Sequence, residues 1–161
     1  MLARWIRAGR VEPGEFAAIG QRLGVAQPPD AAPILLWGEG EASYPFALIA
    51  PLRLAPGKRW RWPAWGLAAA VAAYRQFDVP AYFQDDALWL HGRRIADTAV
   101  DVAGECVVIA SAFLMSFPSS CVDTPSRELE QALRLRLEAQ HGWQFEHSWP
   151  SGAELPALAA A

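Results

Sequence analysis

Lysine and cysteine are both scarce in this sequence. Lys58 is the only lysine among 161 residues, and Cys106 and Cys121 are the only cysteines. Because the two cysteines have no CxxC spacing and are too few for a disulfide scaffold, we expect both to be free thiols. The three histidines form no metal-ligand spacing with one another or with a cysteine. The sequence therefore predicts no metal site.

Long hydrophobic runs are also missing. The longest apolar run, residues 67–74, is about half the length that crosses a bilayer. Residues 1–10 carry three arginines, but no hydrophobic stretch follows them, so no secretory signal is predicted. A net charge of −3 gives no general attraction to nucleic acid or to anionic lipid. We expect a cytoplasmic protein that binds neither nucleic acid nor membrane.

One basic stretch departs from this charge balance. In residues 58–62, Lys-Arg-Trp-Arg-Trp, cations alternate with aromatic side chains, as on a stacking platform for single strands. The simpler interpretation is a turn after Pro56 and Gly57 whose tryptophans cover the core while its arginines face water. We favour the second interpretation.

The hydrophobic residues, 53% of the chain, follow patterns typical of a mixed α/β domain. A chain of this length can bury its core as one domain. Helices are predicted over 15–23, 65–77 and 124–141, and strands over 34–37, 46–54, 87–90, 94–102, 106–114 and 143–147. We expect a hairpin of the first two strands, an antiparallel meander between residues 87 and 114, and an edge or bulge at Pro51. Glu130, Arg134 and Glu138 are expected to form solvated charge pairs on the last helix.

Residues 83–97 carry a family resemblance. They read Phe-Gln-Asp-Asp-Ala-Leu-Trp-Leu-His-Gly-Arg-Arg-Ile-Ala-Asp. This stretch resembles the signature of biotin and lipoate protein ligases, in which an aromatic-Pro-Asn-Asp turn, a short strand and a Gly-Arg-Lys turn precede a strand beginning aliphatic-Ala-Gly. The resemblance implies one ligase-like domain over residues 1–161 with its core at about 33–142. It also implies an α/β (α+β) fold with a mixed, mainly antiparallel sheet packed by helices, as in class II aminoacyl-tRNA synthetases.

Arg94 takes the place of the lysine in that signature. In the ligases the lysine contacts both the carboxylate being activated and the phosphate, which stabilises charge as the acyl-adenylate forms. Arginine keeps the positive charge but has a wide planar guanidinium instead of a compact ammonium. The resemblance thus implies that Arg94 supplies the cation of the site, without normal ATP-dependent ligase activity.

Two glutamates stand where the ligases have arginines. The family's Gly-Arg-Gly-Arg loop corresponds here to residues 37–41, Trp-Gly-Glu-Gly-Glu. Because the carboxylates of Glu39 and Glu41 repel a triphosphate, we predict no ATP cofactor. The family's Gly-x-Gly-x-Asn strand corresponds to residues 110–114, Ala-Ser-Ala-Phe-Leu, which keep small side chains beside a ligand but lack the asparagine.

Carried over residue by residue, the resemblance implies a small ligand pocket. Its residues are expected to be Trp37, Gly38, Gln84, Asp85, Asp86, Arg93, Arg94 and Ala110. The implied ligand is a small acyl or biotin-like carboxylate, such as biotin, lipoate or octanoate, and the implied protein partner is a carrier protein. Asp86 would orient the ligand or hold Arg94. The alternative for Asp85 and Asp86 is an Asx-type turn before a strand.

Two other functions stay open on the sequence. Octanoyl transferases of the same superfamily use a cysteine nucleophile beside the motif lysine, so Cys121 with Arg94 is the corresponding pair for acyl transfer. A nearby guanidinium favours the thiolate that such chemistry needs. The family's Pro-Cys-Gly is not found around Cys121, however. The remaining alternative is a non-catalytic interaction domain whose pocket is filled by its own tryptophans.

Overall fold

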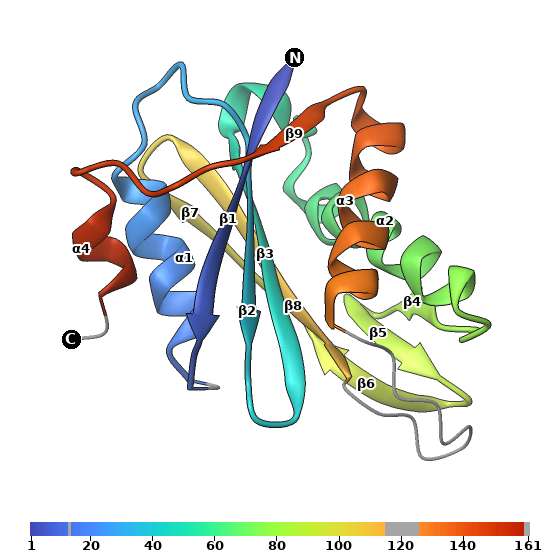
Figure 1. Ribbon diagram of the computed structural model, residues 1–161. Helices are drawn as coiled ribbons and strands as arrows, with labels where there is room; N and C mark the ends of the chain where they lie inside the picture. The colour runs from blue at the N-terminus through green and yellow to red at the C-terminus, as the bar shows by residue number, and fades with distance from the viewer. Residues whose placement is uncertain (13, 115–125, 160–161) are drawn as a thin grey trace.

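The computed structural model describes residues 1–12, 14–114 and 126–159. A six-stranded sheet in the order β7-β8-β3-β2-β1-β9 lies beside a three-stranded sheet in the order β4-β5-β6 (Figure 1). The strands are β1 (Leu2–Arg10), β2 (Ile34–Glu39), β3 (Ser43–Pro51), β4 (Tyr82–Gln84), β5 (Ala87–Leu90), β6 (Arg93–Asp97), β7 (Ala99–Ala103), β8 (Cys106–Leu114) and β9 (Gln144–His147). The helices are α1 (Phe16–Val25), α2 (Trp62–Gln76), α3 (Ser126–His141) and α4 (Leu155–Leu158), with 3-10 turns at Leu52–Leu54 and Arg59–Arg61.

Most strand pairs are antiparallel. β3 runs antiparallel to β2 and β8, β7 runs antiparallel to β8, and both pairs of the small sheet are antiparallel. β1 differs, because it lies parallel to both of its neighbours, β2 and β9. The predicted fold class, a mixed and mainly antiparallel sheet packed by helices, is confirmed.

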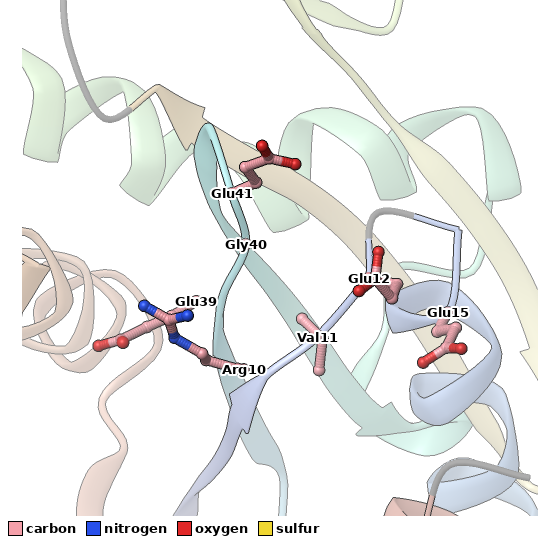
Figure 2. Close-up of a pocket in the computed structure, with 7 residues that line it drawn as sticks. All are labelled: Arg10, Val11, Glu12, Glu15, Glu39, Gly40 and Glu41. Atoms are coloured by element: carbon pink, nitrogen blue, oxygen red, sulfur yellow. The ribbon is translucent and has the colours of Figure 1, made fainter.

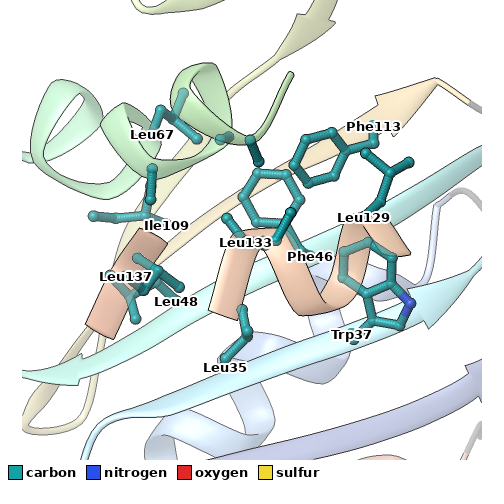
Figure 3. Packing of buried hydrophobic residues seen from close by; sticks show 14 of the residues in the cluster. Leu35, Trp37, Phe46, Leu48, Leu67, Ile109, Phe113, Leu129, Leu133 and Leu137 are labelled. Atoms are coloured by element: carbon teal, nitrogen blue, oxygen red, sulfur yellow. The ribbon is translucent and has the colours of Figure 1, made fainter. Parts of the chain in front are cut away.

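Helices cover both faces of the large sheet, with α2 and α3 on one side and α1 and α4 on the other (Figure 1). Alternation along β2 divides its side chains between two cores: Leu35 and Trp37 belong to the first, Ile34 and Leu36 to the second. Figure 3 shows the first core, where side chains of β2, β3 and β8 pack against α2 and α3. No helix in the described part of the chain is long and apolar enough to cross a membrane.

Several predicted elements are confirmed. The helices expected over 15–23 and 65–77 are α1 and α2, and α3 covers the described part of the helix expected over 124–141. The predicted hairpin is the antiparallel pair of β2 and β3. The strand expected over 143–147 is β9, which pairs with β1 at the edge of the large sheet.

The strand predicted over 94–102 is wrong as a single strand. β6 ends at Asp97 in the small sheet and β7 begins at Ala99 in the large sheet, so the chain changes sheets at Thr98. The predicted meander is therefore divided, with β5 paired to β6 and β7 paired to β8. The chain is extended on both sides of Thr98, so side chains alternate between two faces without interruption. This alternation therefore does not reveal that the chain changes sheets.

Pro51 lies neither at a sheet edge nor at a bulge. It is the last residue of β3, an interior strand, where it pairs with Cys106. The missing N–H of a proline costs little at the final position of a ladder. The chain then turns at Leu52–Leu54, which the sequence pattern had assigned to the strand.

The sequence pattern predicts no element in residues 1–10, yet β1 occupies them. Arginines interrupt its apolar alternation, and they are accommodated because acidic side chains meet them: Arg4 pairs with Glu154, and Arg7 with Glu130. The expectation of solvated charges on α3 is thus wrong for Glu130, whose side chain is only 3% exposed. A buried carboxylate of this kind requires hydrogen-bonding partners, which β1 provides.

Candidate functional site

Three adjoining cavities lie at the end of the large sheet where the β2–β3 hairpin turns. We call them the β8 cavity, the acidic cavity and the Trp37 cavity. The acidic cavity is the central one, since it shares Val11 and Gly40 with the β8 cavity and Glu39 with the Trp37 cavity. This end of the sheet is our candidate site.

The β8 cavity has a volume of about 270 Å³ and a largely apolar lining of small side chains. It is lined by Val11, Phe16 and Ala17 at the start of α1, by Gly40, Ser43 and Pro45 of the hairpin, by Asp97, Thr98 and Ala99 at the crossing between sheets, and by Ala110, Ser111 and Ala112 of β8. The change of sheet at Thr98 thus supplies one wall. A mostly apolar cavity with a few polar groups is suited to a short acyl chain.

The lining of the β8 cavity contains four polar side chains, Ser43, Asp97, Thr98 and Ser111. The Ser111 hydroxyl donates to the backbone oxygen of Asp97 at 2.9 Å, and the Asp97 carboxylate accepts a hydrogen bond from Arg94 Nη1 at 3.0 Å. The Thr98 hydroxyl is buried and has no hydrogen-bond partner within the described residues. Buried hydroxyls normally have a partner, so the unpaired hydroxyl of Thr98 is an unusual feature of this lining residue.

The acidic cavity, about 550 Å³, is lined by Arg10, Val11, Glu12, Glu15, Glu39, Gly40 and Glu41. Figure 2 shows Glu12 and Glu15 in the segment that leads from β1 into α1, and Glu41 in the hairpin. Despite these carboxylates, residues 1–12, 14–114 and 126–159 contain no group of three or more His, Cys, Asp or Glu side chains that could hold a metal ion. The cavity therefore has an acidic lining, but the described residues do not form a metal-binding group there.

The Trp37 cavity is the smallest of the three, about 170 Å³. It lies between the ends of β1 and β2 and the first turns of α3, and it is lined by Arg7, Gly9, Trp37, Glu39, Arg127 and Glu130. The Trp37 indole itself is 2% exposed, and its nitrogen has no hydrogen-bond partner among the described residues.

Arg94, the predicted cation, lies on the exposed surface of the small sheet. Its guanidinium pairs with Asp97 and stacks over the Trp89 ring, 5.5 Å from the ring centroid. Trp89 in turn donates its indole N–H to the backbone oxygen of Gln84 at 2.8 Å. Arg94 is thus connected to the β8 cavity by its ion pair with Asp97, which lines that cavity. Arg93, at the start of β6, is exposed. Their part in ligand binding stays a prediction.

Asp85 and Asp86 form the two-residue turn between β4 and β5. Both have positive φ, 49° and 55°, a conformation that aspartate tolerates better than most residues. Both are exposed, and Gln84 Nε2 donates to Asp85 Oδ2 at 3.4 Å. This geometry favours the turn interpretation of the pair, and a role of Asp86 or Gln84 toward a ligand stays a prediction.

The remaining predicted residues divide between cavities and packing. Ala110 lines the β8 cavity and Trp37 the cavity named after it. Gly38 is closely packed, because an added Cβ would lie 3.0 Å from side-chain atoms of both Phe16 and Val11. The predicted pocket residues are thus spread over two cavities and the small sheet.

Of the two cysteines, Cys106 is among the described residues and Cys121 is not. Cys121 lies outside the described residues, so the acyl-transfer pair of Cys121 and Arg94 stays a prediction. Cys106 is buried at the start of β8, and burial, followed by the charge of Glu105, raises the pKa of its thiol. A thiol with a raised pKa is a poor nucleophile at neutral pH.

The sequence analysis did not predict the crossing residues Asp97, Thr98 and Ala99 as part of a site. The resemblance pointed to Ala110 beside a ligand, but the crossing was hidden inside a predicted continuous strand. It also missed Glu12 and Glu15, because the significance of these glutamates depends on α1 placing them opposite the hairpin. No local motif marks them.

No family model and no curated protein matches this sequence. Solved structures do match it. Lipoate-protein ligase A bound with ATP aligns with a TM-score of 0.78 at 10% identity, over 98% of this chain and 93% of that one. A bi-partite lipoate protein ligase from Thermoplasma acidophilum aligns with a TM-score of 0.76 at 11% identity, over 98% and 91% of the two chains. Biotin protein ligase from Aquifex aeolicus aligns with a TM-score of 0.65 at 9% identity, over 87% and 69%.

At sequence identities this low, the alignments show a shared fold and do not show a shared function. The alignments extend over nearly the whole chain, including β1, which the sequence pattern did not predict. This chain has the fold of the lipoate and biotin protein ligases, as the resemblance in residues 83–97 implies.

Proposed function

We propose that this protein binds a small acyl or biotin-like carboxylate in the β8 cavity and lacks normal ATP-dependent ligase activity. The observation that carries the proposal is the position of the β8 cavity directly beside the acidic cavity, with Val11 and Gly40 shared between them. The apolar lining of the β8 cavity suits an acyl chain, and the negative charge of the acidic cavity repels a polyphosphate.

Electrostatics supports the absence of nucleotide chemistry. The lining of the acidic cavity contains four glutamates and one arginine, and four negative charges with one positive charge give −3. Like unit charges 4 Å apart near a protein surface repel each other by about 4 kcal/mol at an effective dielectric constant of 20. A triphosphate placed there would face several such repulsions with Arg10 as the one cation of the lining.

Arg94 is the cation that we assign to the ligand carboxylate. Its side chain is 51% exposed and its partner Asp97 is 80% exposed, so their ion pair is weak and a ligand can compete for it. Because Asp97 lines the β8 cavity, a carboxylate that replaces it would keep its acyl chain in the cavity. The buried Thr98 hydroxyl offers one further hydrogen bond.

The structural neighbours support the class of ligand and partner. The T. acidophilum ligase is described together with its E2 lipoyl domain, and lipoate-protein ligase A with ATP. We extend to this chain the acyl ligand and a carrier protein as partner, and not the nucleotide. We also infer a cytoplasmic location, on the sequence pattern described above.

Ligand binding can be tested by thermal shift and native mass spectrometry with octanoate, lipoate, biotin and ATP. We expect stabilisation by at least one carboxylate, with no further effect of ATP. Ala112→Leu, which fills the β8 cavity, should abolish the stabilisation, whereas Ala68→Leu, an equal change on the exposed side of α2, should preserve it. Arg94→Ala should weaken carboxylate binding about tenfold, the effect of one charged hydrogen bond.

Other outcomes would contradict the proposal. Stabilisation that requires ATP, together with the mass of an acyl-adenylate, would establish ligase chemistry. A response to none of the ligands would favour the non-catalytic interaction domain instead.

A further inference from the structure

The basic stretch at residues 58–62, which the proposed function does not use, forms an exposed surface. The interpretation favoured on the sequence, in which its tryptophans cover the core, is correct for Trp62, which is 5% exposed. It is wrong for Trp60, which is 71% exposed. Lys58, Arg59 and Arg61 are exposed beside Trp60. We call these four exposed residues the Trp60 surface.

The three cations of the Trp60 surface form no ion pair within residues 1–12, 14–114 and 126–159. Arg61 lies over the Trp60 ring, 5.1 Å from the ring centroid, and Arg59 lies over the Trp62 ring at the same distance. Stacking of this kind uses the face of a guanidinium and leaves the N–H groups at its edge free to bind carboxylates. The first turn of α2, which follows directly, contains no acidic side chain. The surface is therefore locally positive in a protein whose net charge is −3.

Backbone and core contacts hold the Trp60 surface in place. The backbone N–H of Arg61 donates to the Lys58 oxygen at 3.0 Å, which closes the 3-10 turn Arg59–Arg61. The buried Trp62 donates its indole N–H to the backbone oxygen of Pro56 at 2.7 Å. A surface that is ordered before a partner arrives loses less conformational entropy on binding.

The composition of the surface favours a protein as its partner. Tryptophan and arginine are enriched among the residues that contribute most to binding at protein interfaces. A single-stranded nucleic acid usually binds a charged groove with several stacking aromatics. Here only Trp60 of the two tryptophans is exposed, and none of the three cavities described above is lined by residues 58–62. One exposed ring among three cations suits a short acidic peptide segment.

The Trp60 surface lies at the opposite end of the large sheet from the candidate site (Figure 1). β3 begins at Ser43, which lines the β8 cavity, and ends at Pro51. From there the chain leads through Leu52–Leu54 to the surface. A partner bound at the surface therefore does not occupy the β8 cavity.

We propose that the Trp60 surface binds a short acidic segment of a partner protein. Carboxylates of the segment accept hydrogen bonds from the guanidinium groups of Arg59 and Arg61. An apolar side chain of the same segment packs on the exposed part of the Trp60 ring. This interaction is independent of the acyl binding proposed above.

Fluorescence anisotropy with three labelled probes tests the proposal. The first probe is a peptide in which glutamates flank a leucine, the second has glutamines in place of the glutamates, and the third is an oligothymidylate of similar charge. We expect the glutamate peptide to bind saturably and to bind more weakly as salt is added, because salt screens exposed charges. The glutamine peptide should bind about tenfold more weakly, the combined effect of several exposed ion pairs. The oligothymidylate should also bind more weakly than the glutamate peptide.

Two matched pairs of variants locate the binding of the glutamate peptide. Trp60→Ala should weaken it about thirtyfold, the loss typical of a dominant interface residue, whereas Trp149→Ala, at a position 81% exposed, should have little effect. Arg61→Gln should weaken it about fivefold, the effect of one exposed ion pair, whereas Arg136→Gln, at an exposed position of α3, should have little effect. All four positions are exposed, so the variants are expected to fold.

Several outcomes would overturn the proposal. It is wrong if the glutamate peptide does not bind saturably, if the glutamine peptide binds as tightly, or if Trp60→Ala and Trp149→Ala weaken binding equally. Tighter binding of the oligothymidylate that is lost in Trp60→Ala would instead identify a surface for single-stranded nucleic acid. None of these outcomes depends on acyl binding in the β8 cavity.

Discussion

The guanidinium of Arg7 on β1 pairs with the buried carboxylate of Glu130 on α3, with 3.0 Å between Nη2 and Oε1. The same carboxylate accepts the indole N–H of Trp5 at 2.7 Å. The hydrogen bond to Glu130 raises the pKa of Arg7. This arrangement joins the first strand to the last long helix and forms a wall of the Trp37 cavity.

Replacing Glu130 with alanine should lower the free energy of unfolding by about 2 kcal/mol, because the Trp5 N–H loses its acceptor while the half-exposed Arg7 is hydrated again. Urea denaturation measures the change. Gln131→Ala, at an exposed position of the same helix, should stay within about 0.5 kcal/mol of the unsubstituted protein. Equal losses in the two variants would show that the pair contributes nothing specific.

Acid should destabilise the protein through Glu154. The hydrogen bond from Arg4, with further bonds from the Ser151 backbone and Gln27, lowers the pKa of Glu154 from 4.5 to about 2. A pKa lowered by folding contributes stability above pH 4.5 that is lost as the pH falls toward 2, in total roughly 3 kcal/mol. The stability difference between the unsubstituted protein and Glu154→Gln should therefore shrink from pH 6 to pH 3 in thermal melts. A constant difference would contradict this.

His141 should resist protonation. It stacks on Trp143 at 4.2 Å and meets the edge of Trp65 at 4.9 Å, and burial lowers its pKa from 6.5 to about 4. The unfolded chain therefore binds a proton between pH 6.5 and 4 that the folded protein does not. In that interval His141 should reduce stability by up to about 1.4 kcal/mol per unit of falling pH. An NMR titration of its ring protons should show a midpoint near 4, and a midpoint near 6.5 would contradict the packing.

Gly66 should not tolerate a methyl group. An added Cβ would lie 2.7 Å from Cδ1 and Cγ2 of Ile109, where α2 crosses β8. Overpacking of this kind costs about 1–3 kcal/mol, which offsets or exceeds the gain in helix propensity of about 1 kcal/mol. Gly66→Ala should thus be destabilising in urea denaturation, and Ile109→Ala should cost less in its presence than alone. A strictly additive double-mutant cycle would rule out the contact.

Local signals in the sequence predicted much of the architecture. Apolar spacing located α1, α2 and α3, and the pattern of residues 83–97 implied the ligase-like fold that the structural comparisons show. These features are predictable because the spacing of apolar residues and the residue types of turns depend only on neighbouring positions in the sequence. Asp85 and Asp86 are an example, since their turn was one of the two readings available from the sequence.

The candidate site was less accessible to sequence reasoning. The pocket predicted from the resemblance includes Ala110, and the matched stretch 110–114 includes Ser111, and both residues line the β8 cavity. Thr98 was not predicted, because its place in the lining depends on the change of sheet. Glu12 and Glu15 become neighbours of Glu41 only through the packing of α1 against the sheet. Contacts between residues so far apart in the sequence produce no local pattern from which they could be predicted.

The sequence by itself determined the three longer helices, most strands, the acidic character of residues 37–41 and the exchange of the motif lysine for Arg94, because each depends on residue type and short spacing. Only the tertiary structure decided that β1 joins the sheet, that Glu130 is buried against Arg7, and that the Trp37 indole nitrogen is buried without a hydrogen-bond partner among the described residues. Burial and pairing depend on which distant segments meet, and that is settled when the two cores pack against both faces of the sheet.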